Sequence, residues 1–430
     1  MVQPHLRARE TVSERHAGLR VNGARLVDCI EALGRIGADP AGGLTRLGLS
    51  LQEREARTFL ADVFGAAGLV AETDPAGNLL VRRPGTVVAD APVLLLGSHV
   101  DTVVQGGRLD GAYGVVAALE VLRVLHENDV DLPVEVVVAA FANEEGALIQ
   151  LPFWGSRALV GSLENGLAAT DRQGVPVSDY LITTGGAPER LADAAWPAGS
   201  IAAYLELHIE QGPYLERLGV PIGVVEGIVG RTIFDIDVLG QAQHAGTTPM
   251  PDRRDAMGAA AEIVLAVKRI AAEDGLCATA TTGYLQAFPN VTNTITGKVR
   301  LTAEVRDVDP GKIARAEALL RNECARISAA SGCLIEPRVT MRSCAVSTAI
   351  PLREVITEAA EAMGLDYLSM PSGAGHDAQI VAGLAPIGMI FVPSRRGISH
   401  APAEDTSPSD LVHGANVLLH SVLGAQSVLR

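Results

Sequence analysis

The sequence predicts an α/β protein with a mostly parallel sheet flanked by helices, interrupted by an inserted α+β domain. In the first half and near the end of the chain, short apolar runs alternate with helical periodicity, which is typical of parallel sheets covered by helices. Between these regions, strands rich in Thr and Val accompany two long helices, which indicates an antiparallel sheet. The length of 430 residues is also sufficient for two domains.

The elements of the α/β part follow from the spacing of apolar residues. Residues 51–67 have helical spacing, and residues 111–126 predict a helix whose small side chains permit close packing on a sheet. The nearly continuous apolar run 134–141 is typical of a central strand covered on both faces. We also expect a loose polar arm over residues 1–20, a helix at 352–363, and strands at 79–81, 93–96, 204–208 and 385–392.

The pattern changes from about Pro213 onward. Residues 222–229 and 232–239 predict a pair of strands, and residues 253–272 and 312–329 predict two helices. Further strands are expected at 276–287, 295–306 and 334–344. The predicted division is therefore 1–212 and 346–430 for the α/β domain, with 213–345 as an inserted domain that has an antiparallel sheet and two helices.

Composition and charge exclude several classes of protein. Lys and Arg number 35 against 50 Asp and Glu, which gives a formal net charge of −15. Nucleic-acid binding depends on clustered basic residues, so we expect no such partner. Aromatic residues make up only 3% of the chain, too few for a surface that stacks on bases.

Cysteine usage and apolar runs bear on the compartment. The five cysteines are scattered without a CxxC pair, so we expect neither a disulfide scaffold nor a thiolate zinc site, and a cytoplasmic location. The charged N-terminal residues, among them Arg7 and Arg9, are not those of a signal peptide. The longest apolar stretch, 378–394, is broken by glycine and proline, so we expect a buried helix and strand and no membrane span.

Residues that can bind metals follow the predicted strands. His99 comes directly after an apolar strand, where open α/β sheets bind ligands, and Asp101 can accept the other ring N–H of that histidine. Alone, this pair also fits a loop histidine with a capping aspartate. Asp110 stands at a helix start, where an N-cap aspartate is common, but beside metals the same carboxylate can bridge two ions.

Three further segments add imidazoles and carboxylates. Glu144 and Glu145 follow the central apolar strand; they fit either a solvated acidic turn or a dinuclear site in which one coordinates and the other is a general base. Alternation along the strand 204–208 places His208 on one face with Glu206 and Glu210, which is costly in a core without partners. The last segment, 397–404, carries His400.

Taken together, the five segments supply three histidines and several carboxylates at strand ends or in loops. Nitrogen and oxygen donors without thiolates are typical of zinc, with manganese, cobalt and nickel as alternatives. Each segment by itself also fits an ordinary structural role. The combination of all five predicts a site for two divalent metal ions.

The motifs GRLDGAYGV (107–115), ELHIEQGP (206–213) and HAGTTPM (244–250) are specific. With the order and spacing of the five segments, they resemble the dinuclear zinc amidohydrolases of the hydantoinase/carbamoylase family from about Val21 to the C-terminus. That family includes N-carbamoyl-L-amino-acid hydrolases, β-ureidopropionases and allantoate amidohydrolases. It is related to aminoacylases and zinc carboxypeptidases.

The resemblance implies a role for each residue of the centre. His99 and His208 would bind one zinc ion, Glu145 and His400 the other, and Asp110 would bridge the two. The general base would be Glu144, and Asp101 would orient His99. The inserted domain would serve as a lid and dimerisation domain, so a homodimer is expected.

The resemblance also implies substrate contacts. Asn293 and Arg306 would hold a substrate carboxylate, and Gln211 matches a pocket position. His244 would stabilise oxyanion charge in the site of the partner subunit. His244 also fits a surface histidine in a turn, and Arg306 also fits a pair with Asp307, so both alternatives stay open at this point. The segment SGAGHDA (372–378) resembles a loop that lines the substrate with backbone groups.

One motif departs from the family pattern. The family commonly continues the paired glutamates as EEG-x-R-F, whereas this chain has Leu148 and Ile149 at the last two positions. The ligands and the base are all present, so we expect a hydrolase of a linear amide or ureido C–N bond, with an N-carbamoyl-L-amino acid or related ureido acid as substrate. The alternatives are an aminoacylase or dipeptidase on the same scaffold, and a binding protein without catalytic activity.

Overall fold

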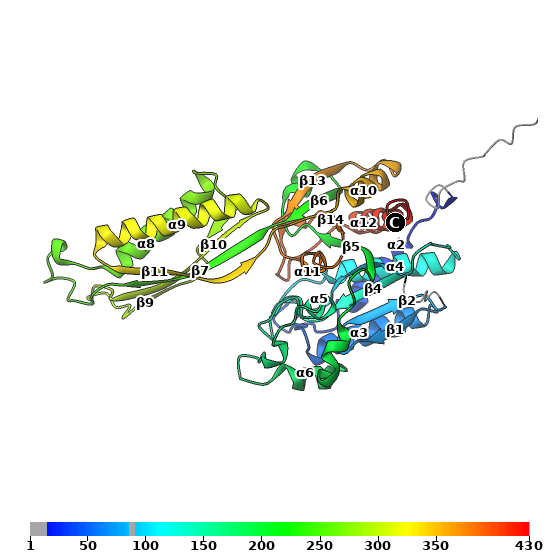
Figure 1. Ribbon diagram of the computed structural model, residues 1–430, viewed down its shortest axis with the longest axis horizontal. Coiled ribbons are helices and arrows are strands. Elements are labelled where there is room, and N and C mark those ends of the chain that lie inside the picture. Colours follow the sequence, from blue (N-terminus) through cyan, green and yellow to red (C-terminus); the bar gives the residue numbers. More distant parts are fainter. Residues whose placement is uncertain (1–14, 86–90, 430) are drawn as a thin grey trace, which may run out of the picture. The chain divides into compact units, whose positions relative to one another are not determined.

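The computed structural model describes residues 15–85 and 91–429. It divides the chain into two compact units, each with its own sheet (Figure 1). The α/β unit comprises Met1–Glu226, Thr348–Met370 and His376–Arg430, and the inserted unit comprises Gly227–Ser347 and Pro371–Gly375. Most of the polar arm expected over the first twenty residues lies outside the described part of the chain. The predicted fold class, a parallel-rich sheet with a separate antiparallel sheet, is confirmed.

Four parallel strands form the centre of the large sheet, in the order β4-β3-β5-β14. They are β3 (Val93–His99), β4 (Val136–Phe141), β5 (Ile201–Ile209) and β14 (Ile387–Val392), and nearly every residue in them is buried. Antiparallel strands extend the sheet on both sides. These outer strands are β1 (Val70–Thr73), β2 (Leu79–Arg82), β6 (Ile222–Ile228) and β12 (Val346–Ser347), and β13 (Tyr367–Ser372) pairs with β6.

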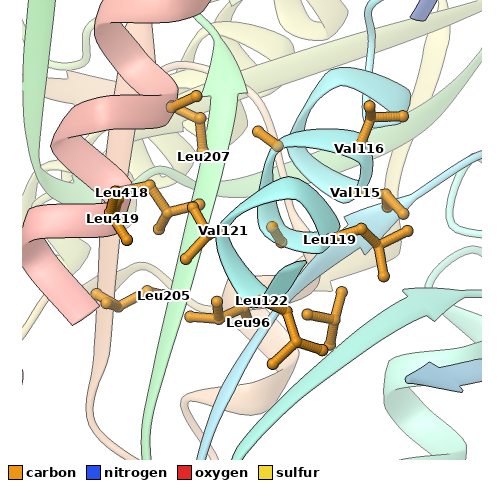
Figure 2. Packing of buried hydrophobic residues seen from close by; sticks show 14 of the residues in the cluster. Leu96, Val115, Val116, Leu119, Val121, Leu122, Leu205, Leu207, Leu418 and Leu419 are labelled. Atoms are coloured by element: carbon orange, nitrogen blue, oxygen red, sulfur yellow. The ribbon is translucent and has the colours of Figure 1, made fainter. Parts of the chain in front are cut away.

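The helices of the α/β unit include longer and shorter ones, and some of them pack directly on the central strands. The longer ones are α2 (Gly23–Leu33), α3 (Leu51–Gly65), α4 (Ala112–Glu127), α10 (Ile350–Ala362) and α12 (Pro408–Ala425), and the shorter ones are α5 (Trp154–Leu159), α6 (Val177–Thr184), α7 (Tyr214–Leu218) and α11 (Asp377–Val381). Helix α4 packs on β3, β4 and β5, and Figure 2 shows its Leu122 beside Leu96 of β3. The same core includes Leu418 of α12. Within the described residues, no helix combines the length and the hydropathy that crossing a membrane requires.

Close packing of α4 on β5 depends on Gly114. A Cβ atom at this position would lie 2.1 Å from the carbonyl oxygen of Leu207 and 3.1 Å from the Cβ of Ser98. The helix backbone therefore approaches the strand as closely as only glycine allows. Because α4 begins two residues after Asp110, and β5 carries His208, this contact also sets the distance between two polar residues of the predicted site.

The inserted unit is an antiparallel sheet packed against two helices. Its strands are β7 (Gly230–Leu239), β8 (Thr279–Thr281), β9 (Leu285–Phe288), β10 (Lys298–Asp307) and β11 (Leu334–Ser343), in the order β11-β7-β10-β8, with β9 also paired to β10. The helices are α8 (Ala256–Ala272) and α9 (Pro310–Ser331). Alternate residues of β7 and β10, such as Phe234 and Leu301, are buried in a core that the helices complete. This alternation is typical of a sheet covered on one face.

Two predictions for this region need correction. The expected strands 222–229 and 232–239 exist, but they do not pair with each other, because β6 belongs to the large sheet and β7 to the small one. Only Val229 separates β6 from β7, and a hairpin needs a loop of at least about two residues. The run 276–287 is not one strand but the two short strands β8 and β9.

We expect the substitution Gly114→Ala to destabilise the α/β unit. The added methyl group overlaps the carbonyl oxygen of Leu207, and overpacking of this kind costs about 1–3 kcal/mol. Gly65, at the end of α3, is the matched control because a Cβ there would meet nothing within 4 Å. Thermal unfolding should show a lower melting temperature for Gly114→Ala and no decrease for Gly65→Ala. Equal melting temperatures would mean that α4 can move away from β5.

Candidate metal centre

The polar residues singled out in the sequence meet at the carboxyl ends of the parallel strands. His99 is the last residue of β3, Glu144 and Glu145 follow β4, and His208 is the penultimate residue of β5. His400 lies in the loop that leads from β14 to α12. Because the carboxyl ends of parallel strands share one edge of a sheet, four separate segments converge there, as ligand sites of open α/β sheets do.

The carboxylate of Asp110 lies between two groups of side chains. Its Oδ1 is 3.2 Å from Nε2 of His208 and 3.5 Å from Nε2 of His99. Its Oδ2 is 3.2 Å from Nε2 of His400, and that nitrogen is also 3.2 Å from Oε1 of Glu145. The two oxygens of one carboxylate therefore face two different sets of candidate ligands.

Backbone carbonyl groups fix the orientation of the two buried histidines. Nδ1 of His99 lies 3.0 Å from the carbonyl oxygen of Asp101, and Nδ1 of His208 lies 2.9 Å from that of Ile209. A carbonyl can only accept, so we assign the ring proton to Nδ1 in both residues. Each Nε2 then lies on the side of Oδ1 of Asp110, and that of His208 also accepts the backbone N–H of Gly111 at 3.0 Å.

The carboxylate of Asp101 has a different contact from the one expected. Its nearer oxygen is 3.5 Å from Nδ1 of His99, whereas its carbonyl oxygen makes the closer hydrogen bond. The carboxylate accepts the backbone N–H groups of Glu144 at 3.0 Å and Glu145 at 3.1 Å. Asp101 thus contacts His99 through its main chain and holds the paired glutamates through its side chain, because the loop after β4 brings its N–H groups closer than the ring.

The centre holds more buried negative charge than an apolar core tolerates. Burial, the largest contribution, raises the pKa of Glu144 well above its usual value; His99 opposes this effect, while Glu145 adds to it. Burial would also raise the pKa of Asp110, but the neighbouring histidines hold that pKa well below its usual value. Buried carboxylates at this density need cations close by.

The donor atoms present fit divalent cations. Three imidazoles and two carboxylates, with no thiolate among them, are the ligands of zinc and similar ions. In addition, Oε1 of Glu145 is buried and makes no well-formed hydrogen bond, with Nε2 of His400 3.2 Å away, although such acceptors are almost always satisfied. A cation beside His400 and Asp110 would satisfy this oxygen.

Of the three polar residues predicted on one face of this strand, only His208 faces Asp110, and Glu210 lies one residue beyond the end of β5. Glu206 instead accepts from the hydroxyl of Ser98 and the backbone N–H of Ala378, and Glu210 accepts two N–H groups at the start of α7. Hydrogen bonds, rather than metal ions, thus offset the free energy lost when the carboxylates of Glu206 and Glu210 are buried. Period-2 alternation identifies the face of a strand, but it cannot distinguish these partners.

A residue that the sequence pattern did not single out lies beside His208. The ring of His376 packs edge-on against that of His208, with centroids 4.7 Å apart. Glu206, His208 and His376 also lie close enough to hold an ion. Since Nδ1 of His208 is engaged with a carbonyl, a single nitrogen remains, and it cannot serve both this group and Asp110. The motif SGAGHDA, which contains His376, predicted that backbone groups of this loop line the substrate, but it gave no role to the histidine side chain.

Gln211 also reaches the centre. Its Nε2 lies 2.6 Å from Oδ2 of Asp110, and its backbone has a positive φ of 59°.

The two residues that replace the family's Arg and Phe, Leu148 and Ile149, differ in their exposure to solvent. Ile149 is fully buried in a small cluster with Trp154, whereas Leu148 is half-buried. The replacement at Ile149 therefore concerns packing, and only Leu148 is accessible.

The remaining substrate-binding candidates belong to the inserted unit. His244 is exposed, and its Nδ1 accepts N–H groups from Gly246 and Thr247, so its Nε2 carries the proton. A β-bridge joins His244 to Thr294, which places Asn293 beside the histidine loop.

Arg306 is held by two oxygen atoms within the inserted unit. Its Nε donates to Glu304 at 2.6 Å, and its Nη1 donates to the carbonyl of Gly373 at 2.9 Å. The alternative partner Asp307 instead accepts from the backbone of Asp309, 2.8 Å away, and faces Lys312. Glu304 lies two residues before Arg306 on the same face of β10, whereas Asp307 lies on the opposite face.

A parallel-rich α/β unit with this cluster at its strand ends, and an inserted antiparallel unit, define a class of metal-dependent hydrolases. Peptidase family M20/M25/M40 is the family that matches, over residues 95–423. The chain belongs to this family.

Similar proteins span almost the whole chain. It is 39% identical to an N-carbamoyl-L-amino acid amidohydrolase of Geobacillus stearothermophilus, over 94% of this chain and 98% of the relative. It is 37% identical to an allantoate amidohydrolase of Escherichia coli, over 90% and 94%. Among solved structures, a hydantoinase/carbamoylase family amidase from Burkholderia multivorans has a TM-score of 0.86 and 37% identity, covering 94% of this chain and 98% of that one. AtUAH in complex with (S)-hydroxyglycine has a TM-score of 0.82 and 30% identity, covering 97% and 100%.

We predict that Asp101→Ala weakens cation binding. The substitution leaves two N–H groups beside the centre without acceptors, and loss of such supporting hydrogen bonds typically reduces metal affinity about 10–100-fold. Asp171→Ala is the matched control, since Asp171 also accepts two loop N–H groups, from Gln173 and Val175. Calorimetric titration of the metal-free protein should show the loss only for Asp101→Ala. Unchanged affinity in that variant would contradict the role assigned to Asp101.

Proposed function

We propose that this chain hydrolyses the ureido C–N bond of an N-carbamoyl-L-amino acid or a related ureido acid. The observation that carries the proposal is the Asp110 carboxylate, which separates a His99–His208 pair from a Glu145–His400 pair with Glu144 alongside. The 39% identity to an N-carbamoyl-L-amino acid amidohydrolase, over nearly the full length of both chains, supports this substrate class.

The proposed ligands would hold two divalent cations, one on each side of Asp110. His99 and His208 would bind the first, and Glu145 and His400 the second, with one oxygen of Asp110 toward each. Zinc fits the donors best, with manganese, cobalt and nickel as alternatives. Bound cations of this kind polarise a carbonyl group and make water a nucleophile near neutral pH.

Glu144 is the proposed proton carrier of the reaction. Its Oε2 lies 3.7 Å from Nε2 of His99, and burial together with Glu145 raises its pKa, so the carboxylate can accept a proton. It would take that proton from the attacking water and deliver it to the nitrogen that leaves when the C–N bond breaks. For a carbamoyl amino acid, the products are the amino acid, ammonia and carbon dioxide.

The substrate's carboxylate would bind to the inserted unit. Arg306 offers a guanidinium already oriented by Glu304 and Gly373, and a planar fork of this kind matches a carboxylate. Asn293 would add a neutral hydrogen bond. The protonated Nε2 of His244 can donate to oxyanion charge, and by the family resemblance we place it in the centre of a second copy of the chain, in a closed homodimer.

A second candidate is an aminoacylase or dipeptidase, which the peptidase family description favours. The carbonyl attacked would be the same, but the leaving side of the substrate would differ. A panel of carbamoyl, acyl and formyl amino acids, ureidoglycolate and allantoate distinguishes the two. Release of ammonia from ureido acids, abolished by a chelator and restored by zinc or cobalt, supports the first candidate. Turnover of acyl amino acids alone would support the second.

We predict that Glu144→Gln abolishes most turnover without loss of cations. The amide keeps the size of the side chain but cannot accept a proton, and general acid–base catalysis contributes roughly 10²–10⁴-fold. The value of kcat should therefore fall at least about a hundredfold in protein with the full cation content. Glu55→Gln, on the exposed face of α3, is the control. Activity near that of the wild type in metallated Glu144→Gln would refute the assignment.

We predict that Arg306→Lys raises KM for carboxylate-bearing substrates more than it lowers kcat. Lysine retains the charge but loses the fork that pairs with two oxygens. Arg300→Lys is the matched control, because Arg300 lies on the same face of β10 and pairs with Asp235. Steady-state kinetics on both variants check the prediction, and an unchanged KM for Arg306→Lys would exclude this residue from carboxylate binding.

A further inference from the structure

Glu404 is a buried carboxylate that lies outside the proposed ligand set. The residue is only 2% exposed, and it lies in the loop between η4 (Arg395–Gly397) and α12, four residues after His400. Its Oε1 accepts the backbone N–H groups of Leu109 at 2.8 Å and Asp110 at 3.0 Å. Glu404 therefore joins the loop that carries His400 to the segment that leads into α4.

The hydroxyl of Ser399 provides a second link to the same aspartate. It lies 2.8 Å from Oε2 of Glu404 and 2.7 Å from Oδ2 of Asp110. Oδ2 is the oxygen that faces His400, at 3.2 Å. Glu404 thus holds Asp110 directly at its backbone, and Ser399, whose single hydroxyl proton can serve either carboxylate, lies between the two side chains.

The segment before Asp110 leaves room for the carboxylate of Glu404. A Cβ atom at Gly107 would lie 2.0 Å from Oε1 of Glu404, so a larger residue there would displace the side chain. Arg108 reinforces the contact from outside, because its Nη2 donates to Asp405 at 3.0 Å and its Nη1 to the carbonyl of Glu404 at 3.3 Å. The segment before Asp110 and the loop after His400 are therefore joined at several points.

We propose that Glu404 is a positioning residue for the cation on the Glu145–His400 side of Asp110. It fixes the spacing between Oδ2 of Asp110 and the loop of His400, and this inference rests on the proposed function. The other side of Asp110 has independent support, since His99 and His208 are oriented by the carbonyl groups of Asp101 and Ile209. Loss of Glu404 therefore weakens one cation site and leaves the other intact.

If Glu404 only stabilised the fold, its removal would have a different effect. A buried glutamate that accepts backbone N–H groups stabilises the fold wherever it lies, and its removal would then lower the stability without selecting one site. Glu120 of α4 is the matched control for that role. It is also 2% exposed, and it accepts the backbone N–H of Asn22 at 2.9 Å and a guanidinium N–H of Arg25 at 2.7 Å.

The test is a titration of the metal-free, full-length chain with cobalt(II), followed by calorimetry and by the visible absorption of the bound ion. The wild type should bind two ions. In Glu404→Ala, the affinity of one site should fall about 10–100-fold, as expected when a group that orients a ligand is removed, while the other stays within about twofold. Glu404→Gln keeps an oxygen for the two N–H groups and should recover most of this affinity.

Two further variants keep the test independent of folding. Ser399→Ala removes only the hydroxyl between the two carboxylates and should weaken the same site. Glu120→Ala should lower the melting temperature of the metal-free chain and change neither site. Excess cobalt should restore kcat in Glu404→Ala with KM unchanged, because saturation compensates for weak binding but does not repair a misfolded centre.

The outcomes separate this inference from the proposed function. If the wild type binds two ions and the Glu404 and Ser399 variants lose neither, or lose both equally, the positioning role is wrong and the proposed function stands. If the wild type binds two ions but releases no ammonia from ureido acids, a selective loss in Glu404→Ala still supports the positioning role. A wild type that binds fewer than two ions overturns both.

Discussion

The structure of the α/β unit depends on keeping the carboxylate of Asp110 ionised in a place where water cannot solvate it. Asp110 is almost fully buried, yet its pKa is held low because imidazoles on both sides offset the cost of burial. No single strand can supply those partners. The centre therefore requires four chain segments to end at the same edge of one sheet, and the parallel order of β4, β3, β5 and β14 meets that requirement.

Rigidity of the backbone is the second requirement, because main-chain groups orient most of the centre. Carbonyl groups of Asp101 and Ile209 hold the histidine rings, and the carboxylates of Asp101 and Glu404 hold N–H groups of the ligand-bearing loops. Such contacts keep their geometry only if the strands themselves cannot shift. Apolar packing on the central strands and the close approach at Gly114 keep the strands in place. The geometry of the site therefore depends on the packing of the core.

Local pattern was sufficient for most of the fold and for part of the site. The run 134–141 and the small residues of 111–126 predict a buried strand and a helix packed on it, and both are present. Pairing was harder to predict, because the apolar residues of β6 indicate a strand but not its sheet. Contacts such as Ser399 with Glu404, or the Asp101 carboxylate with the loop after β4, depend on segments brought together by folding, and no spacing in the sequence encodes them.

In the proposed function, the chemistry belongs to the α/β unit and the binding of the substrate's carboxylate to the inserted unit. The candidate ligands and the proposed base all lie in the α/β unit, where buried hydrogen bonds hold the rings of His99 and His208 and the loops of Asp110 and Glu145, so substitutions there disturb several groups at once. The residues proposed to bind the substrate's carboxylate lie in the inserted unit on exposed or half-buried surface, where a change affects few neighbours. Leu148 is an accessible exception within the α/β unit. Under this proposal, substitutions at such positions can change the preferred ureido or amide substrate while the candidate ligands stay unchanged.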